Sequence, residues 1–538
     1  MDLTRREILG TLAGASLAAM SGCGTPPPPF PKGEIIGASD SFGHQLRDGL
    51  LPKPAADAWT DIPLVIVGGG VAGLSAAWHL KKSGFNDFVL LELEQRAGGT
   101  SCSGSSPVSA YPWGGHYLPV PMKKNTQLIR LLDEMKILES IGADGTPIVA
   151  EQFLVRDPDE RIFFNGRWYE GLFPSEGATS EDLRQFEVFK KEIDQWANWR
   201  DGQGRRAFSV PVATCSDDPH ATALDKISMR QWLDSKGFNS KRLNWYVEYA
   251  TLDDHGTTLE QTSAWAGLFY FAARQEKSGV EHQQFITWPE GNGRLIAHLH
   301  EKVKAHVRLG VATTDIASTP EGLRVTAYDR SLNKALGFRA KHVIFAAPQF
   351  LAQRVIAEYR NAPPPHIKHF QYGAWFVANL FIKERPKLNE NDMSLCWDNV
   401  IYDSKSVGYI VATHQSCIDY GKTVLTYYYP FIEENPRDAR TRLLAGDWAH
   451  WAEFTLADLS TAHPDIRSII ERIDIMRWGH AMIQPRAGFI WSDARMQAAK
   501  PFGAIHFAHS DLSGMAFFEE AFHHGLRAAD EVLLQARA

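Results

Sequence analysis

Cysteine is scarce in this sequence, with 5 residues in a chain of 538. None of them stands in a C-x-x-C pair or at a spacing from histidine that is typical of zinc ligands. The sequence therefore predicts neither a metal site nor a dense disulfide framework, and it leaves open whether the thiols are free or paired.

Long apolar runs and a basic stripe are missing as well. No apolar run approaches the roughly 20 residues that a membrane-spanning helix needs. The net charge is −7, and because acidic and basic residues are spread along the chain, no segment is predicted to bind nucleic acid. With 44% hydrophobic residues, the chain is long enough for a large core and for more than one domain.

The first residues are predicted to be an export signal. Residues 4–9 read Thr-Arg-Arg-Glu-Ile-Leu, the form of a twin-arginine signal, and the apolar residues 8–20 are too few for a membrane helix. Residues 20–23 are similar to a lipobox that ends in Cys23. We therefore expect residues 1–23 to engage the twin-arginine export machinery, the protein to be periplasmic, and membrane contact to be limited to a lipid anchor at Cys23. An ordinary N-terminus with a chance arginine pair is the alternative.

Residues 61–100 carry the strongest pattern in the chain. Residues 64–67 are apolar and β-branched, as in a strand buried within a parallel sheet. Gly68, Gly70 and Gly73 then form G-x-G-x-x-G. The first glycine allows the turn, the second lets the backbone approach a pyrophosphate, and the third lets the next helix pack on the strand. The free N–H groups at the start of that helix favour an anion.

A second strand, over residues 88–91, ends in Glu92, about 20 residues beyond the glycines, where a ribose hydroxyl needs an acceptor. Glu92 also begins the motif Glu92-x-x-x-Arg96-x-Gly98-Gly99. This pair of motifs resembles the flavin-containing amine oxidase superfamily, in which the bound dinucleotide is FAD. The family has arginine after the second glycine pair, whereas this chain has Thr100. The resemblance implies a first set of FAD contacts from Gly68, Gly70, Val71, Ala72, Gly73, Glu92, Arg96, Gly98 and Gly99.

The resemblance extends into the middle of the chain. Gly114 and Gly115 match a glycine pair that borders the isoalloxazine ring in the family, which implies that His116 approaches the active site. The apolar residues 307–311 predict a strand, and the family pattern makes the backbone of Val311 the expected adenine contact.

The C-terminal region carries a second strong match. Residues 504–514 predict a strand and a turn, followed by a helix over residues 515–534, as in the C-terminal FAD motif of the family. The resemblance implies that Asp511 hydrogen-bonds the ribityl or pyrophosphate region. With His509, the motif resembles its form in the spermidine dehydrogenase branch. Because the motif lacks cysteine, we expect non-covalent FAD. The residues expected to face flavin N1 and O2, where a helix N-terminus stabilises negative charge, are Gly514, Met515 and Ala516.

Aromatic residues and histidines are the expected catalytic groups. Residues 476–489 are similar to the family element whose aromatic side chains line the flavin, and the resemblance implies that Trp478 and Phe489 form an aromatic cage. His116 and His480 are the expected proton acceptors. A packed, hydrogen-bonded histidine is the alternative at both positions.

Two further features bear on the reaction. Many amine oxidases have a lysine on the strand predicted over residues 372–382, where this chain has Trp375 and Phe376, so we expect a dehydrogenase rather than an oxidase. Acidic pairs stand elsewhere, and we expect Asp253 and Asp254 to be turn or cap residues and Glu519 and Glu520 to complement a helix dipole. Binding of a cationic substrate is the alternative for both pairs.

The predicted fold is an α/β fold in which two domains are interleaved. One is a Rossmann-like FAD-binding domain with a parallel sheet and a β-meander, and the other is an α+β substrate domain. Residues 24–59 are expected to form a Pro-rich spacer and surface segment. The FAD-binding domain is predicted from residues 60–124, 285–348 and 475–538, and the substrate domain from residues 125–284 and 349–474.

The expected function is that of an exported FAD-dependent oxidoreductase that oxidises an amine or polyamine by hydride transfer to flavin N5. Its expected partners are a small-molecule amine and an electron acceptor, which is a quinone, a carrier protein or oxygen. Three alternatives stay open from the sequence: a flavin-dependent C–C desaturase of the carotenoid or protoporphyrinogen type, a nicotinamide-dependent dehydrogenase, and a non-catalytic flavin-binding scaffold.

Overall fold

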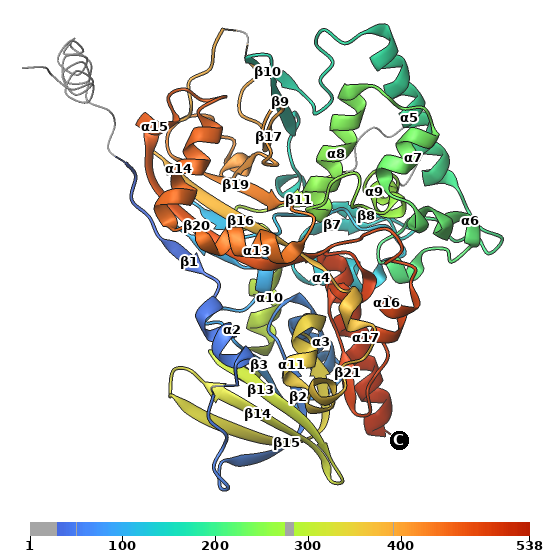
Figure 1. Ribbon diagram of the computed structural model, residues 1–538, viewed down its shortest axis with the longest axis vertical. Helices are drawn as coiled ribbons and strands as arrows, with labels where there is room; N and C mark the ends of the chain where they lie inside the picture. The colour runs from blue at the N-terminus through green and yellow to red at the C-terminus, as the bar shows by residue number, and fades with distance from the viewer. Residues whose placement is uncertain (1–29, 50, 275–283, 391, 538) are drawn as a thin grey trace, which may run out of the picture.

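The computed structural model describes residues 30–49, 51–274, 284–390 and 392–537. The predicted export signal at residues 1–23, including Cys23, lies outside these residues. Two large sheets organise the described chain, one in the lower and one in the upper half of Figure 1. No helix of the described part combines the length and the apolar character that a membrane span requires.

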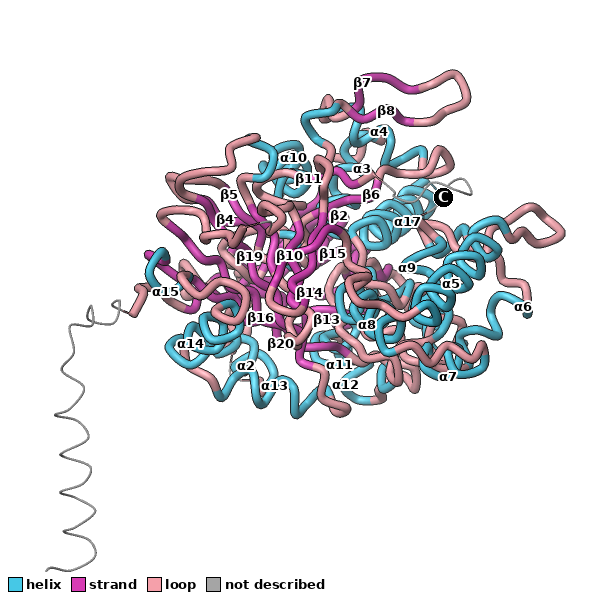
Figure 2. The backbone as a smooth tube through the Cα atoms, turned by 90° about the horizontal axis from the view of Figure 1, so that it is seen from above, coloured by secondary structure: helices cyan, strands magenta, loops and turns pink. Residues whose placement is uncertain are grey.

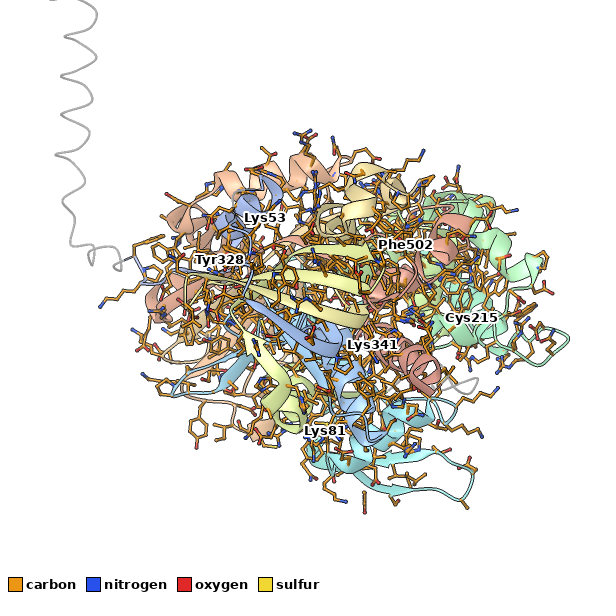
Figure 3. The ribbon with its side chains drawn as sticks, turned by 90° about the horizontal axis from the view of Figure 1, so that it is seen from below. Lys53, Lys81, Cys215, Tyr328, Lys341 and Phe502 are labelled. Atoms are coloured by element: carbon orange, nitrogen blue, oxygen red, sulfur yellow. The ribbon has the colours of Figure 1, made fainter. Side chains whose placement is uncertain are left out.

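The lower sheet has seven strands and follows the predicted pattern of a parallel sheet joined to a meander. Five of its strands run parallel to one another. One of these five also pairs with the remaining two strands in an antiparallel meander. The parallel strands are β2 (Trp59–Val67), β3 (Phe88–Glu92), β12 (Val307–Leu309), β15 (Lys334–Phe345) and β21 (Ile505–Phe507), and β13 (Val311–Thr319) and β14 (Gly322–Asp329) complete the meander with β15. Figure 3 views this end of the molecule, where the strands of the sheet lie side by side.

Burial on both faces explains the apolar run at the centre of this sheet. Leu64 and Ile66 of β2 pack in one core cluster, whereas Val65 and Val67 pack in another, because successive side chains point to opposite faces of a strand. The first cluster lies under α3 (Val71–Lys82), α10 (Gly293–Val303), α17 (Phe518–Arg537) and α4 (Thr126–Glu134). The second includes the meander with α11 (Gln349–Val355) and α12 (Ala357–Asn361).

The upper sheet has eight strands, in the order β1, β20, β16, β19, β18, β17, β9, β10. Their bounds are β1 (Ile35–Gly37), β20 (Ile470–Ile483), β16 (Tyr372–Ile382), β19 (Thr423–Phe431), β18 (Tyr409–Val411), β17 (Asp398–Ile401), β9 (Glu160–Phe164) and β10 (Arg167–Glu170). One face packs on α13 (Pro436–Ala445), α14 (Trp448–Leu459) and α15 (Ile466–Ile469). The other face contributes side chains to a cluster that borders the candidate site.

A helical layer and short hairpins complete the described chain. The layer comprises α5 (Ser180–Asn198), α6 (Pro219–Thr222), α7 (Met229–Ser235), α8 (Lys241–His255) and α9 (Ala264–Ala272). The hairpins pair β4 (Ser103–Ser105) with β5 (Ala110–Pro112), β6 (Tyr117–Pro119) with β11 (Phe285–Thr287), and β7 (Leu138–Ile141) with β8 (Pro147–Val149). The last hairpin stands out from the rim of the molecule in Figure 2. Two further helices are α2 (Asp40–Arg47) and α16 (Asp493–Ala498).

The fold class predicted from the sequence is confirmed, and the sheets refine where its two parts meet. The expected boundary between residues 474 and 475 falls inside β20, all of which belongs to the eight-stranded sheet. The chain returns to the seven-stranded sheet only at β21. Within the segment expected to be a spacer, residues 35–37 form β1 and pair with β20.

Candidate active site

The glycine-rich turn has the geometry that a dinucleotide cradle requires. Gly68 has a φ of 103°, and a side chain at Gly73 would overlap the carbonyl oxygen of Gly68. Gly70 differs from both, because its φ is −72° and a Cβ there would meet nothing within 4 Å. The space above Gly70, at the N-terminal end of α3, is therefore open to an anionic group such as a pyrophosphate.

Glu92 stands at the end of β3 next to this turn. Its carboxylate accepts hydrogen bonds from the backbone N–H groups of Gly69 (2.6 Å) and Glu94 (2.8 Å), and burial raises its pKa to about 7. The N–H of Gly98 donates to the carbonyl of Gly69 at 2.8 Å, which places the second glycine pair over the first turn. Arg96 is exposed and forms no ion pair with the described residues, so it is free to hold a phosphate.

Gly114 and Gly115, which we call the third glycine pair, line the far end of the cradle. A side chain at Gly114 would overlap the carbonyl oxygen of Thr100, and one at Gly115 would come within 2.9 Å of the Asn292 amide nitrogen. Asn292 is 4% exposed, and its Oδ1 has no hydrogen-bond partner in the described structure. Open space at Gly70, a free arginine and an orphaned amide oxygen are what an FAD would fill, so the residues present fit this cofactor.

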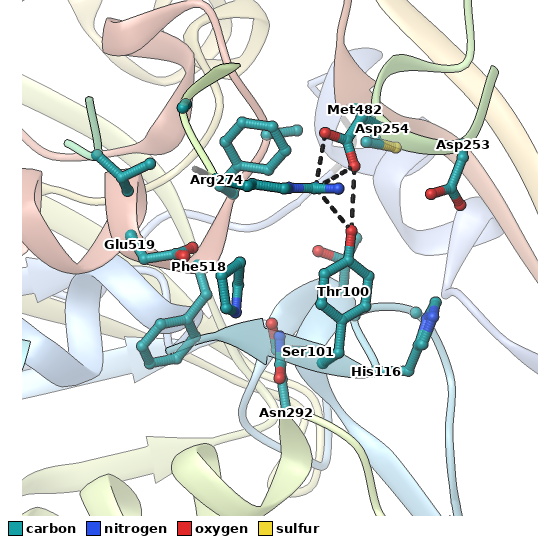
Figure 4. Close-up of a pocket in the computed structure, with 18 of the residues that line it drawn as sticks. Thr100, Ser101, His116, Asp253, Asp254, Arg274, Asn292, Met482, Phe518 and Glu519 are labelled. Atoms are coloured by element: carbon teal, nitrogen blue, oxygen red, sulfur yellow. Dashed lines mark hydrogen bonds and ion pairs between the residues drawn. The ribbon is translucent and has the colours of Figure 1, made fainter. Parts of the chain in front are cut away.

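A cavity begins where the cradle ends. The cavity and its open mouth together have a volume of about 1290 Å³. The wall on the cradle side is formed by Thr100, Ser101, Gly114, Gly115 and Ala516. Figure 4 shows Arg274 and Asp254 bonded to each other inside this cavity. Aromatic rings dominate the remaining wall, from His116, Tyr117, Phe269, Trp375, Tyr428, Trp478, Phe517 and Phe518.

The polar group inside the cavity is an ion pair. Arg274 donates to both oxygens of Asp254 (2.7 and 2.8 Å) and to the hydroxyl of Tyr117 (2.8 Å). Its guanidinium also lies over the rings of Tyr117 and Tyr270 at 5.5 and 4.4 Å. The positive charge of Arg274 is therefore neutralised within the protein.

Asp253 and Glu519 add two carboxyl groups to the cavity, and the ion pair of Arg274 is made with Asp254 instead. In Figure 4, Glu519 lies on one side of Arg274 and Asp253 on the other, beyond Asp254. Asp253 forms no ion pair or side-chain hydrogen bond with another described residue, and burial together with the carboxylates of Asp254 and Asp398 raises its pKa. The cavity is thus an aromatic chamber with excess carboxylate, a chemistry that fits an organic cation.

The expectation that Asp253 and Asp254 are turn or cap residues is not met by the geometry. α8 runs through both of them to His255 and ends at Gly256, which takes the left-handed conformation with a φ of 61°. Carboxylates in the last turn of a helix oppose its dipole, so neither aspartate stabilises α8. Glu520 does have a structural role, because its carboxylate accepts from Val212 N–H at 2.8 Å and from the Ser513 hydroxyl.

Glu519 gives a test of this electrostatic environment. Burial raises its pKa to about 7, from an ordinary value of 4.5. Between these pH values the unfolded chain loses the proton that the folded protein keeps, so this group lowers folding stability as the pH rises. We expect the free energy of unfolding of Glu519→Gln, measured in urea, to equal that of the wild type near pH 4.5. At pH 8 it should be higher than that of the wild type by about 3 kcal/mol. An unchanged pH dependence in Glu519→Gln would contradict this expectation, and Glu321→Gln, at an exposed position, is the control.

His116 and Trp478 are the predicted catalytic residues that the structure brings into the cavity. Burial lowers the pKa of His116 to about 4, so its imidazole is neutral at pH 7. Its ring lies 5.0 Å from that of Tyr428, whose hydroxyl donates to the Gly114 carbonyl at 2.9 Å. The indole N–H of Trp478 donates to the carbonyl of Trp113 at 2.6 Å, which fixes the ring beside the third glycine pair.

His480 and Phe489, the other two predicted catalytic residues, lie outside the cavity wall. His480 is exposed and stacks on Phe350 at 4.0 Å. Phe489 is buried behind the cradle, at 5.1 Å from Phe370 and next to Gly514. The aromatic wall of the cavity instead includes rings from other elements, such as Tyr428 of β19.

The remaining predicted cofactor contacts surround the cradle. Val311 is the first residue of β13, two positions after Leu309, which pairs with Glu92. Asp511 is buried and accepts from the Tyr372 hydroxyl at 2.5 Å and the Gln349 N–H at 3.0 Å. Because α17 begins at Phe518, Gly514, Met515 and Ala516 form the turn before it, where Met515 is fully buried and Ala516 reaches the cavity. Val71 and Ala72 form the first turn of α3.

Several cavity residues were not predicted to be functional, among them Arg274, Tyr428 and Trp375, and Asp253 was considered only as the alternative to a turn or cap residue. Only Asp253 carried a usable signal, because acidic residues at the C-terminal end of a helix are unfavourable unless something else requires them. Tyr428 and Trp375 belong to apolar strands, where every second residue faces the cavity and nothing in the local sequence shows which face that is.

The fold and the cradle define an α/β flavoprotein with a substrate cavity, and comparisons with known proteins agree. A family model described as flavin containing amine oxidoreductase matches residues 71–533. Putrescine oxidase with bound putrescine has a TM-score of 0.65 at 18% identity, covering 88% of this chain and all of that chain. Cyclohexylamine oxidase from Brevibacterium oxydans has a TM-score of 0.61 at 16% identity, covering 89% of this chain and all of that chain.

A flavin-containing amine oxidase of Oncorhynchus mykiss is 20% identical over 303 residues. That match spans 53% of this chain and 50% of the fish protein, so this chain spans about half the length of the curated relative. The chain belongs to the flavin-containing amine oxidoreductase family. It is an FAD-dependent oxidoreductase, and the nicotinamide-dependent alternative is set aside.

Proposed function

We propose that this protein is an exported dehydrogenase that oxidises an amine or polyamine with FAD. The observation that supports the substrate class is the cavity wall, in which aromatic rings surround the carboxylates of Asp253 and Glu519. An alkylammonium ion suits this wall, because it is attracted by the carboxylates and packs against the ring faces. The carboxylates count against a lipid desaturase, and the open cavity counts against a scaffold without substrate.

Removal of the ammonium proton is the first chemical requirement. An amine must be neutral to react, because a protonated nitrogen has no lone pair to support the developing iminium. The buried aromatic wall disfavours the cation and so assists loss of the proton. Asp253 must be ionised to accept this proton. Burial and the neighbouring carboxylates raise its pKa, so its ionised form is a stronger base than an ordinary aspartate, and a bound ammonium ion favours that form. We assign it this role ahead of His116, whose pKa burial lowers to about 4.

The cradle determines where the carbon next to nitrogen must lie. FAD bound there supplies the acceptor for the hydride that leaves this carbon. Trp478 is held against the Trp113 carbonyl, and Tyr428 against the Gly114 carbonyl, so both rings are fixed beside the third glycine pair. These rings orient the substrate and exclude water from the reacting carbon.

The proposal of a dehydrogenase rests on the strand that holds a lysine in many amine oxidases. Trp375 lines the cavity from this strand, whereas Phe376 faces the opposite side and lies 5.0 Å from Trp451. Lys383 follows the end of β16, and no lysine of the described chain lines the cavity. We propose a quinone or a carrier protein as the electron acceptor and, from residues 1–23, export to the periplasm.

Anaerobic titration of the signal-less protein tests the proposal. We expect spermidine, putrescine or an aromatic amine to remove the visible absorption band of oxidised flavin. Air should then restore the band far more slowly than a soluble quinone does. A yellow protein that none of these amines bleaches contradicts the substrate class, and rapid reoxidation by air contradicts the dehydrogenase assignment while leaving the substrate class standing.

A further inference from the structure

Residues 30–48, which we call the N-terminal strap, connect the two sheets. In Figure 1 this blue segment runs from the edge of the eight-stranded sheet down to the seven-stranded sheet, passing through β1 and α2. None of its residues lines the cavity. The strap precedes the first FAD motif in the chain, yet its contacts lead to both the cofactor cradle and the substrate cavity.

The upper half of the strap is bound to β20. The N–H groups of Ile473 and Ile475 donate to the carbonyls of Lys32 (2.8 Å) and Glu34 (2.9 Å), and Glu34 also pairs with Arg472 at 2.7 Å. Without the strap, β20 would be the edge strand of its sheet.

Gly33 makes this approach possible. Its φ is 154°, and a side chain there would overlap the carbonyl oxygen of Ile473 and come within 2.8 Å of the indole nitrogen of Trp448. Any larger residue must push the strap away from β20.

The lower half of the strap is bound to the loop after β3. Both the N–H and the hydroxyl of Ser39 donate to the carboxylate of Glu94, at 2.9 and 2.8 Å. Arg330 donates to the Ser39 hydroxyl at 3.1 Å and lies over the ring of Phe42 at 4.8 Å. Phe42 is 6% exposed and stacks on Tyr328 of the meander. Tyr328 is labelled in Figure 3.

Two contacts near the middle of the strap lead to residues of the cradle and of the cavity wall. The N–H of Glu94 donates to Glu92, the expected ribose acceptor, at 2.8 Å. Gly37, two residues before Ser39, pairs with Met476 of β20, two residues before Trp478 in the cavity wall. The bonded sequence Glu92–Glu94–Ser39–β1–β20–Trp478 therefore runs from cradle to cavity through the strap.

We propose that the strap couples FAD binding to the seating of β20 and that Ser39 is a positioning residue for the Glu92 carboxylate. The proposal rests on the FAD cofactor and is independent of the substrate. Because coupling between two sites is reciprocal, a strap that strengthens FAD binding must itself be held more firmly when FAD is bound. This gives two measurements that need no enzymatic activity.

The first measurement is the FAD dissociation constant of full-length variants reconstituted from the flavin-free protein. Ser39→Ala removes the hydroxyl that holds Glu94, and Gly33→Ala displaces the strap from β20, remote from Glu92. We expect each to raise the dissociation constant by about tenfold. Matched controls within the strap are Ser41→Ala, at an exposed position, and Gly43→Ala, where a Cβ meets nothing within 4 Å.

The second measurement is limited trypsin cleavage after the exposed strap residues Lys32 and Arg47. FAD should slow cleavage of the wild-type protein and of both controls, and this protection should be lost in Ser39→Ala. A strap that only covers the surface would show lower thermal stability in the variants with no change in FAD affinity.

Dissociation constants of Ser39→Ala and Gly33→Ala within about twofold of the wild type would overturn the proposal. So would equal protection by FAD in Ser39→Ala and wild type. If Gly33→Ala does not fold, Ser39→Ala and the protease measurement decide the question. Failure of every amine to reduce the flavin would leave both measurements interpretable, since they depend on the cofactor alone.

Discussion

Gly70→Val is expected to fold normally and to purify without the yellow colour of flavin. Gly70 has a φ of −72°, which valine adopts without strain, and a Cβ there meets no protein atom within 4 Å. The added carbons would instead occupy the space into which the pyrophosphate must fit. We expect FAD affinity to fall by at least about 100-fold, measured by reconstitution with FAD, while the urea midpoint stays unchanged.

Two companions make this expectation specific. Gly202→Val adds the same carbons at an exposed turn, where a Cβ also meets nothing within 4 Å, and should leave both properties unchanged. Gly73→Val should lose stability as well as flavin, because its side chain would overlap the Gly68 carbonyl within the protein. A yellow Gly70→Val protein with normal affinity would show that the cofactor does not cross this turn.

Asp253→Asn is expected to slow reduction of the flavin by an amine by about 100-fold, the size of effect that loss of a proton acceptor produces. The substitution keeps the shape of the side chain and removes its ability to take a proton. Because Asp253 has no ion-pair partner among the described residues, its replacement should not disturb the fold. Stopped-flow absorbance under anaerobic conditions measures the rate.

Two other aspartates provide the comparison. Asp234→Asn, near the end of α7 and exposed, should behave as the wild type. Asp254→Asn should destabilise the protein, because it removes a carboxylate that holds Arg274 at 2.7 Å in a nearly buried pair. If Asp253→Asn reduces at the wild-type rate across the pH range, Asp253 is not the proton acceptor, and His116 becomes the better candidate.

The comparison of Trp478 with Phe489 shows what limits a reading of one motif. Both were expected in the aromatic cage because they share a family element. Trp478 lies on β20 and enters the cavity, but the strand ends at Ile483, and the following turn carries Phe489 into the core behind Gly514. His480, also on β20, is exposed. The direction in which the side chains of one motif face depends on where its strand ends. The packing of residues that are distant in the chain decides where that is.

The sequence by itself determined the cofactor cradle of this protein. Gly70, Gly73 and Glu92 act within residues 68–94, and the residue types there indicate the backbone conformations that the turn needs. The fold class follows from the same patterns, since a buried parallel strand and the helix after it have characteristic periods.

Only the tertiary structure decided the substrate cavity and the strap. The cavity wall combines residues of α8, α9, α17, β16, β19 and β20 with the cradle, so its chemistry depends on which faces of these elements meet. Asp253 reads locally as a turn residue and becomes an unpaired carboxylate only when α8 packs beside the aromatic strands. Ser39 gains its role only because β1 carries it to Glu94, 55 residues further along the chain. Such contacts have no local signal, because their energy comes from burying surfaces that are distant in sequence.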